Sequence, residues 1–318
     1  MEFSRLHHRY ILFMLVGALA TVIFLFALPK DRLIAFANMR QDYIKGHWYY
    51  DRLFRDPRPI DVAFIGTSHT NGDIKDGLVE RLLRERYGRK LHVANLGLPE
   101  HGRNLHHMVA RDLFETKSPR LLVLEVKAYE SRKSHHLYGR LARVDDIIRP
   151  AAAINPSVFR DVLSGLRWQL EQFVLPESLP KYSSLPDYGF HNNDKGVRLT
   201  AAEMEKQVEK RKKVAVESYL GDRWDAIEFM FPRHYVSKIV EMARSRDTRI
   251  AFIYLPYFGA PPTPRDYERY LQVGDVWLPP PRIMDDPGYW KDFGHLNTWG
   301  AVELAPWVAS QVDRAQEP

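Results

Sequence analysis

Short apolar runs alternate with helical patterns along much of the chain, and this alternation constrains the fold more than any other feature. Runs rich in apolar residues, typical of strands buried on both faces, occur at 62–65, 91–96, 121–126 and 250–255. Apolar residues at helical spacing occur between or after these runs, at 76–86, 104–116, 233–246 and 299–312. The pattern predicts a three-layer α/β/α fold with a mainly parallel sheet covered by helices on both faces.

Residues 130–232 interrupt this alternation, and we interpret them as a helical insertion within a domain that covers 59–318. Helical patterns at 156–173 and 201–220 flank a turn-rich stretch at 185–193.

Two further stretches of the domain have an unusual composition. The charged run at 206–213 is typical of a solvated helix face, with contact to a partner or glycan as the alternative. The stretch at 259–287 is rich in proline, so we expect it to be irregular but stiff.

Composition excludes several kinds of site. The 318 residues contain no cysteine, which removes disulfides, thiol catalysis and cysteine zinc sites and permits an oxidising compartment. The net charge of +6 suits a membrane surface or an acidic glycan. Basic residues do not form a stripe interleaved with aromatics, so we expect no nucleic-acid binding.

The N-terminal region contains an uncharged, nearly pure apolar run at 10–28. Its length is close to the roughly 20 residues that cross a bilayer. We expect residues 1–30 to form a short cytoplasmic tail and an uncleaved transmembrane helix at the inner or plasma membrane, with the globular part outside the cytoplasm. The alternative is a cleaved signal peptide, for which Ala35-Phe36-Ala37 resembles a cleavage site.

Residues 31–58 look like an amphipathic connector between this helix and the domain. The aromatic residues Trp48, Tyr49 and Tyr50 could rest at the membrane interface or pack on the domain. The sequence alone leaves both alternatives open.

A candidate nucleophile follows the first apolar run, which ends in Gly66-Thr67-Ser68. Ser68 is expected at the carboxyl edge of the sheet, where α/β folds bind ligands. Serine needs a base, and Asp292-x-x-His295 near the other end of the chain supplies an imidazole and a carboxylate that could orient it. We therefore predict a catalytic triad of Ser68, His295 and Asp292.

The oxyanion formed by attack on a carbonyl needs hydrogen-bond donors. The N–H groups of Ser68 and Gly97 are the expected donors, with Gly102 as the fallback, although Asn95 and Gly97 could simply form a strand-ending turn.

Three neighbouring residues are candidates for substrate binding. His69 could line the pocket or pack under the turn, and Arg103 and Asn104 could contact substrate or merely start a helix.

These motifs resemble those of the SGNH (GDSL-type) hydrolase superfamily. The first block corresponds to residues 64–74, the second to Asn95-Leu96-Gly97 with Gly102, and the last to Asp292-x-x-His295-Leu296-Asn297. The resemblance covers the chain from about residue 60 onward, apart from the insertion. It implies an SGNH-like fold with Ser68 as nucleophile, His295 as base, Asp292 as its orienting carboxylate and Gly97 as an oxyanion donor.

The chain departs from that superfamily at two positions. Thr67 replaces the usual aspartate before the serine, and no asparagine oxyanion donor follows the third strand, which ends in Glu125-Val126-Lys127. An ionised Glu125 would repel an oxyanion unless it is protonated, turned away, or paired with Lys127 or an arginine.

With the N-terminal anchor, the chain resembles membrane-anchored SGNH-like proteins such as the D-alanyl transfer protein DltD and alginate-acetylation proteins. Such proteins work beside a membrane-bound O-acyltransferase (MBOAT) that passes acyl groups across the membrane.

Several histidines lie close together in the sequence, at His101, His106 and His107 and at His135 and His136. They lack the His-Glu-x-x-His spacing of a helical zinc site. We therefore expect neither a metal nor another cofactor.

Three hypotheses for function follow. The leading one is an O-acyltransferase that acts on a cell-envelope or secreted polysaccharide through Ser68, with an MBOAT partner. The second is a carbohydrate esterase or deacetylase of the same fold. The third is a non-catalytic scaffold of a polysaccharide-modification complex, favoured by the missing asparagine and opposed by the presence of all three triad residues.

Overall fold

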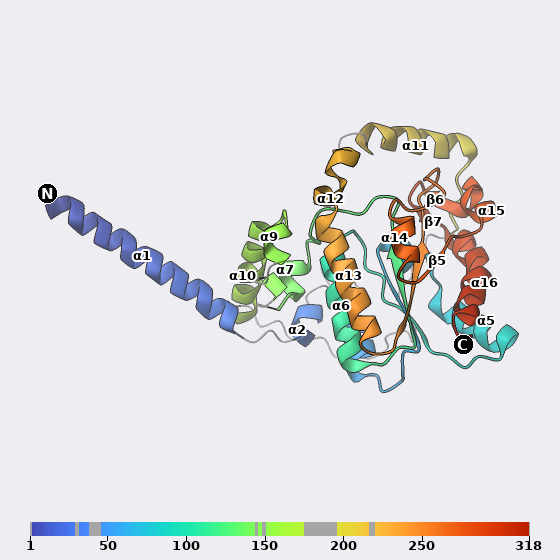
Figure 1. Cartoon of the computed structure of the whole chain (residues 1–318), viewed down its shortest axis with the longest axis horizontal. Helices are drawn as coiled ribbons and strands as arrows, with labels where there is room; N and C mark the ends of the chain where they lie inside the picture. Colours follow the sequence, from blue (N-terminus) through green and yellow to red (C-terminus); the bar gives the residue numbers. More distant parts are fainter. Residues whose placement is uncertain are drawn as a thin grey trace.

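The computed structural model describes residues 2–28, 32–37, 46–143, 146–147, 151–174, 196–215 and 220–317 (Figure 1). The turn-rich stretch at 185–193 and the end of the helical pattern at 201–220 fall partly or wholly outside the described residues.

Five parallel strands form the central sheet, in the order β2-β1-β3-β4-β5. The strands are β1 (Val62–Ile65), β2 (Val93–Asn95), β3 (Leu121–Val126), β4 (Arg249–Tyr254) and β5 (Asp275–Trp277). The register places Val62 beside both Val93 and Leu121. The predicted parallel sheet is therefore confirmed, and its strand order creates a switch point between β1 and β3, where such sheets bind ligands.

Helices cover both faces of this sheet (Figure 1). The covering helices are α6 (Arg103–Thr116) and α13 (Met230–Arg244) on one face and α5 (Asp76–Tyr87) and α16 (Thr298–Arg314) on the other. Successive strand residues alternate between the two layers, so Ala63 and Ile65 pack with the first pair while Val62 and Phe64 pack with the second. This double burial explains why the strands read as nearly continuous apolar runs.

The stretch at 259–287 is more regular than expected from its prolines. It contains α14 (Tyr267–Leu271), β5 and α15 (Pro281–Met284), and β5 extends the sheet by pairing Ala251 with Asp275. A strand of three residues is too short to show a periodicity in sequence, so the pairing with β4 decides its structure.

The connector is built into the domain. It comprises α2 (Arg32–Ala37), α3 (Gly46–Tyr50) and the π-helix η2 (Asp51–Arg55). Phe36, Trp48 and Tyr49 are buried in the core beside α6, and the Tyr49 hydroxyl donates to the Leu96 carbonyl. Of the two alternatives for these aromatic residues, packing on the domain is therefore the one observed.

The remaining elements lie outside the five-stranded sheet and its four covering helices. They are α1 (Glu2–Ala27), α4 (Ser68–Asp73), α7 (Tyr138–Leu141), α9 (Ala151–Ile154), α10 (Val158–Val174), α11 (Ala201–Ala215), η3 (Asp222–Trp224), α12 (Asp225–Glu228), η4 (Pro287–Tyr289), β6 (Trp290–Asp292) and β7 (His295–Leu296). Helix α1 projects away from the body, and α7, α9 and α10 gather near its domain-proximal end (Figure 1).

Candidate active site

Ser68 is the first residue of the short helix α4, which begins almost as soon as β1 ends. The sequence predicted α5 but not this shorter helix before it. Gly66 is required in the turn because a Cβ there would collide with the side chains of Thr70 and Glu125. The half-buried serine is thus presented at the carboxyl edge of β1, beside the switch point of the sheet.

The structure brings Ser68, His295 and Asp292 into one hydrogen-bonded chain. The distance from His295 Nε2 to Ser68 Oγ is 2.8 Å, and His295 Nδ1 lies 2.9 Å from Asp292 Oδ1. An ionised carboxylate only accepts hydrogen bonds, so Nδ1 carries the proton and Nε2 is left to accept from the serine hydroxyl. This is the arrangement in which a histidine can act as a general base toward a serine.

Asp292 and His295 lie on the β6–β7 hairpin, whose tip is shaped by the aspartate itself. Asp292 Oδ1 accepts the backbone N–H groups of Gly294 (2.8 Å) and His295 (2.9 Å). Burial raises the pKa of Asp292, but the hydrogen bonds that it accepts from His295 and from the Gly294 N–H outweigh that effect, so the pKa is lowered. Asp292 is therefore ionised at neutral pH.

The hairpin is also tied to α11 and to α16. Gln207 Oε1, on α11, accepts the Phe293 N–H at 2.8 Å. Asn297 caps α16 by accepting the Gly300 N–H at 2.9 Å, and its amide donates to the Val197 carbonyl at 2.8 Å. Sequence reasoning did not identify Gln207, because nothing in a charged amphipathic pattern marks one residue as a contact to a distant hairpin.

Glu125 lies beneath the nucleophile turn and accepts hydrogen bonds from both of its threonines. The N–H of Thr67 donates to Oε2 (2.7 Å) and its hydroxyl to Oε1 (2.9 Å), while Thr70 donates through its N–H (3.1 Å) and its hydroxyl (2.5 Å). Lys127 forms an ion pair with the same carboxylate. We call Thr67, Thr70, Glu125 and Lys127 the buried platform.

The buried platform settles how Glu125 is accommodated. Burial alone would raise the pKa of Glu125, but the charge and hydrogen bond of Lys127 and the Thr70 hydroxyl lower it well below its usual value. The carboxylate is thus ionised, paired with Lys127 and directed into the turn. The two departures from the SGNH pattern are coupled, since Thr67 donates to the residue that stands where an asparagine was expected.

The Gly97 N–H, one expected oxyanion donor, is already used. It donates to Asn95 Oδ1 at 2.9 Å, and the Asn95 amide donates to the Thr70 and Ile74 carbonyls at 2.7 Å each. Asn95 and Gly97 therefore form a turn at the end of β2, which is the alternative that the sequence left open for them. Space also requires a glycine at 97, because a Cβ there would lie 2.5 Å from the Asn71 nitrogen.

The N–H groups of Ser68 and Gly102 are the other two expected oxyanion donors. Gly102 is the residue before α6, and a Cβ there would collide with His135. Ser68 N–H makes no hydrogen bond within the described part of the chain. The Ser68 amide is therefore the better placed donor.

His69 packs directly beneath the catalytic candidate His295. The two rings meet edge to face with centroids 5.1 Å apart, and His69 Nδ1 lies 2.9 Å from the Leu255 carbonyl oxygen. Because a carbonyl only accepts, Nδ1 carries the proton. Burial, followed by the charge of Lys127, lowers the pKa of His69 well below its ordinary value, so the ring is neutral.

Arg103 and Asn104 are placed as structural residues. Arg103 is buried at the start of α6 and forms an ion pair with Glu130. Asn104 is also buried. Its side-chain amide donates to Ser134 Oγ, and its side-chain oxygen accepts the His135 N–H. The alternative of helix-start residues fits these contacts, and a direct substrate contact does not, because neither side chain reaches solvent.

Glu100, His135 and His136 form a group whose ligand atoms lie within 4.8 Å of one another. His135, however, has both ring nitrogens engaged: Nδ1 accepts the Leu137 N–H at 3.1 Å and Nε2 donates to the Pro99 carbonyl at 2.9 Å. No lone pair of this imidazole is left for a metal, so the group does not fit a metal site.

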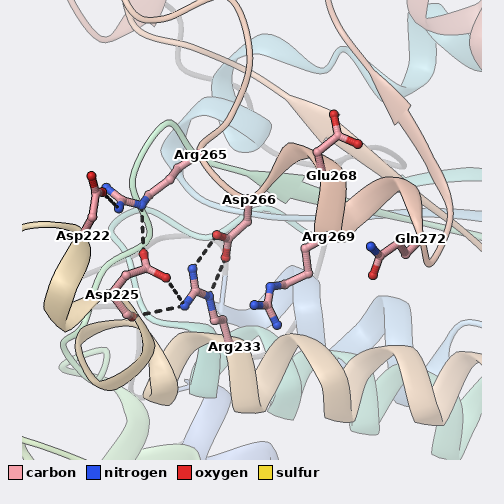
Figure 2. A pocket seen from close by; sticks show the side chains of 8 residues that line it. All are labelled: Asp222, Asp225, Arg233, Arg265, Asp266, Glu268, Arg269 and Gln272. Atoms are coloured by element: carbon pink, nitrogen blue, oxygen red, sulfur yellow. Dashed lines mark hydrogen bonds and ion pairs between the residues drawn. The ribbon is translucent and has the colours of Figure 1, made fainter.

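A surface hollow of 740 Å³ lies at α12–α14 and contains none of the triad residues (Figure 2). Its side chains form a chain of ion pairs in which Arg265 bridges Asp222 and Asp225, and Arg233 bridges Asp225 and Asp266. These pairs tie the end of the insertion to α13 and α14, which is a structural role.

Comparisons with known proteins add little to this site. No family model matches the sequence, and no curated protein does. Among solved structures, a candidate acylhydrolase from Bacteroides fragilis aligns with 12% identity over 84% of this chain and 96% of that chain, with a TM-score of 0.33. A likeness at that TM-score carries no weight, and the α/β assignment rests on the sheet topology itself.

Proposed function

We propose that this chain is a membrane-anchored, extracytoplasmic, SGNH-like serine enzyme that transfers O-acyl groups to a cell-envelope or secreted polysaccharide. The observation that carries the proposal is the hydrogen-bonded chain from Ser68 Oγ through His295 to Asp292. Ser68 and His295 lie 227 positions apart in the sequence, so it is the fold that brings them together.

In the proposed reaction, Ser68 Oγ attacks the carbonyl carbon of an acyl donor and passes its proton to His295 Nε2. Asp292 stabilises the imidazolium, and the Ser68 N–H donates to the developing oxyanion. The donor oxygen then leaves with the proton from His295. A sugar hydroxyl attacks the resulting serine ester, its proton moves to His295, and the acylated sugar departs as Ser68 regains its proton.

Access to the triad favours a large acceptor. The side chains of His295 and Asp292 are 26% and 38% exposed, so the site opens at the surface. A polymer can reach such a site without threading. The same openness admits water, which would hydrolyse the serine ester, and esterase or deacetylase activity is therefore the second candidate.

The proposed anchor is helix α1. Its segment His8–Leu25 is long and apolar enough to cross a membrane, and none of it is buried in the protein. Retention of the helix, instead of cleavage after Ala37, is supported by the burial of Phe36 and by the ion pair between Arg32 and Asp112. Cleavage there would remove residues that pack in the core of the domain. Intact mass analysis of the membrane-extracted protein should therefore find Met1 or Glu2 at its N-terminus.

Ser68 can be tested with a fluorophosphonate probe and intact-protein mass spectrometry. We expect the wild-type chain to gain one adduct, Ser68→Ala to gain none, and Ser310→Ala, a matched change on α16, to label like wild type. Acyl transfer should fall by roughly 10⁴-fold or more in Ser68→Ala. Well-folded wild-type protein that does not label, either alone or in native membranes, would contradict the proposal and favour the scaffold.

Transfer and hydrolysis can be separated by adding candidate polysaccharide acceptors to the acylated protein. If the acyl group on Ser68 is lost faster with acceptor than in buffer, and acylated glycan is formed, the protein is a transferase. Equal rates of loss with and without acceptor support the esterase. The proposed MBOAT partner rests on the resemblance alone, and a detergent pull-down that recovers no polytopic acyltransferase would remove it.

A further inference from the structure

The solvent-facing side of α10 is apolar, the reverse of an ordinary surface helix. Phe159, Leu163 and Leu170 are 84%, 66% and 53% exposed, and Leu166 lies half-buried among them. Their spacing of four, three and four residues puts all four side chains on one side of the helix. We call Phe159, Leu163, Leu166 and Leu170 the α10 stripe. Exposed apolar surface of this extent marks an interaction site.

The orientation of α10 is fixed by its opposite side, so the stripe cannot turn inward. Trp168 is buried, with the Arg140 guanidinium 5.5 Å from its ring. Asp161 is also buried and accepts the Asn155 amide at 2.8 Å. Rotating the helix to hide the stripe would expose both residues and break these contacts.

The stripe has a basic edge. Arg160 and Arg167 each follow a stripe residue by one position, so both flank it on the same side of the helix. Arg160 reaches the Ser134 carbonyl at 2.6 Å, and Arg167 is exposed. Apolar side chains bordered by arginines are typical of helices that lie in the headgroup region of a membrane.

The stripe lies beside the proposed anchor. Helix α1 packs against α10, and the Gln169 amide donates to the Leu28 carbonyl, just after the end of α1, at 3.3 Å. Figure 1 shows α10 at the domain-proximal end of α1. A bilayer that surrounds α1 would therefore have its surface close to α10.

We infer that α10 lies in the membrane interface and inserts the α10 stripe into lipid. The inference rests on the anchor in the proposed function, since α1 defines where the bilayer is. Contact with lipid, instead of a protein partner, is favoured by the contact of α10 with the apolar helix α1 and by the arginine edge. The chain would then hold the bilayer at two places, one spanning and one lying flat.

The absence of cysteine makes a direct test possible, because a single introduced cysteine is the only labelling site. We would label Phe159→Cys, Leu163→Cys and Leu170→Cys with an NBD fluorophore in the full chain, reconstituted in phosphatidylcholine–phosphatidylglycerol nanodiscs. Val16→Cys in α1 reports on the anchor. Tyr87→Cys is the exposed control, because it is the last residue of α5, a helix that lies far from α1 in Figure 1.

Quenching by doxyl-labelled lipid and by aqueous iodide distinguishes the outcomes. We expect the three α10 labels to be quenched by shallow doxyl lipid, with an iodide quenching constant several-fold lower than that at Tyr87→Cys. The inference is overturned if iodide quenches the α10 labels as strongly as the Tyr87→Cys label. It is also overturned if neither iodide nor doxyl lipid quenches the α10 labels, which is the result that a bound protein partner would give. Quenching of the Val16→Cys label by deep doxyl lipid shows that α1 spans the bilayer. If that quenching occurs together with one of the two contradicting results for α10, the anchor stands and only the inference fails. If it does not occur, the anchor itself is wrong.

Discussion

The two halves of the candidate site are built in different ways. Ser68 rests on the buried platform, whose carboxylate is inaccessible to water and accepts four hydrogen bonds from two threonines. His295 and Asp292 lie on a short hairpin, where both side chains are partly exposed and the tip is held by hydrogen bonds from the Gly294 and His295 N–H groups to Asp292. Ser68 is therefore fixed by the core of the fold, whereas we expect His295 and Asp292 to tolerate substitution with little effect on folding. Changes in the first half should cost stability, and changes in the second should cost chemistry.

The largest expected effect tests the surface half. Asp292→Asn keeps an oxygen that accepts the hairpin N–H groups. Its amide NH₂, however, favours the His295 tautomer that is protonated on Nε2, which cannot accept the Ser68 proton, so acyl turnover should fall by roughly 10⁴-fold. The melting temperature should change little, because the side chain is partly exposed. Kinetics and thermal melts on the same sample check this. A large loss of stability would break the distinction between the two halves.

The next effect tests the buried half. Glu125→Gln leaves the Lys127 ammonium buried without its ion-pair partner, which should lower the free energy of unfolding by about 3–5 kcal/mol. The double variant Glu125→Gln/Lys127→Met should recover part of that loss, because it removes the unpaired charge. Urea denaturation measures both. The exposed change Glu85→Gln on α5 should stay within about 0.5 kcal/mol of wild type. Equal stability of all three variants would mean that the platform does not support the turn.

His69 lies between the two halves and should make stability depend on pH. Its lowered pKa means that the folded chain binds fewer protons than the unfolded chain below about pH 6.5, so this residue makes stability fall as the pH falls. His69→Gln, which keeps an amide donor for the Leu255 carbonyl, should reduce that slope by up to about 1.4 kcal/mol per pH unit. Denaturation between pH 7 and 5 measures it, and parallel curves for the two proteins would contradict the assignment.

The smallest effect concerns the link from α11 to the hairpin. Gln207→Ala removes the acceptor of the Phe293 N–H, a contact worth about 1 kcal/mol. We expect a turnover loss of at most roughly ten-fold, with global unfolding almost unchanged. A matched change on the same helix, Glu205→Ala, should leave turnover at the wild-type value. If both variants behave alike, α11 does not position the hairpin.

The sequence predicted the parts of the fold that local pattern determines. The strands at Val62–Ile65 and Leu121–Val126 have the expected bounds because both faces are buried, and Ser68 follows the first of them. The short strand β5 and the burial of Trp48 and Tyr49 could not be predicted, because both depend on neighbours distant in the chain.

The candidate site shows the same limit. The residue types of the triad could be read from two motifs, but the fate of Glu125 could not, since four structural alternatives were open to one carboxylate. Its pairing with Lys127, two residues along the same chain segment, was among them, whereas its hydrogen bonds to Thr67 and Thr70 were not. Likewise, Arg103 and Asn104 looked available for substrate until Glu130 and Ser134 were found beside them.

The packing of the connector into the domain limits how far the domain can move away from helix α1. Only four peptide steps separate Leu28, just after α1, from Arg32, which is paired with Asp112 in the body. Such a length of chain spans at most roughly 14 Å. A domain on a long flexible tether would reach a wide range of heights above a membrane, but with α1 as the proposed anchor this domain would hold Ser68 at one nearly constant height above the lipid. Only the stretch of polymer that passes through that layer would be modified.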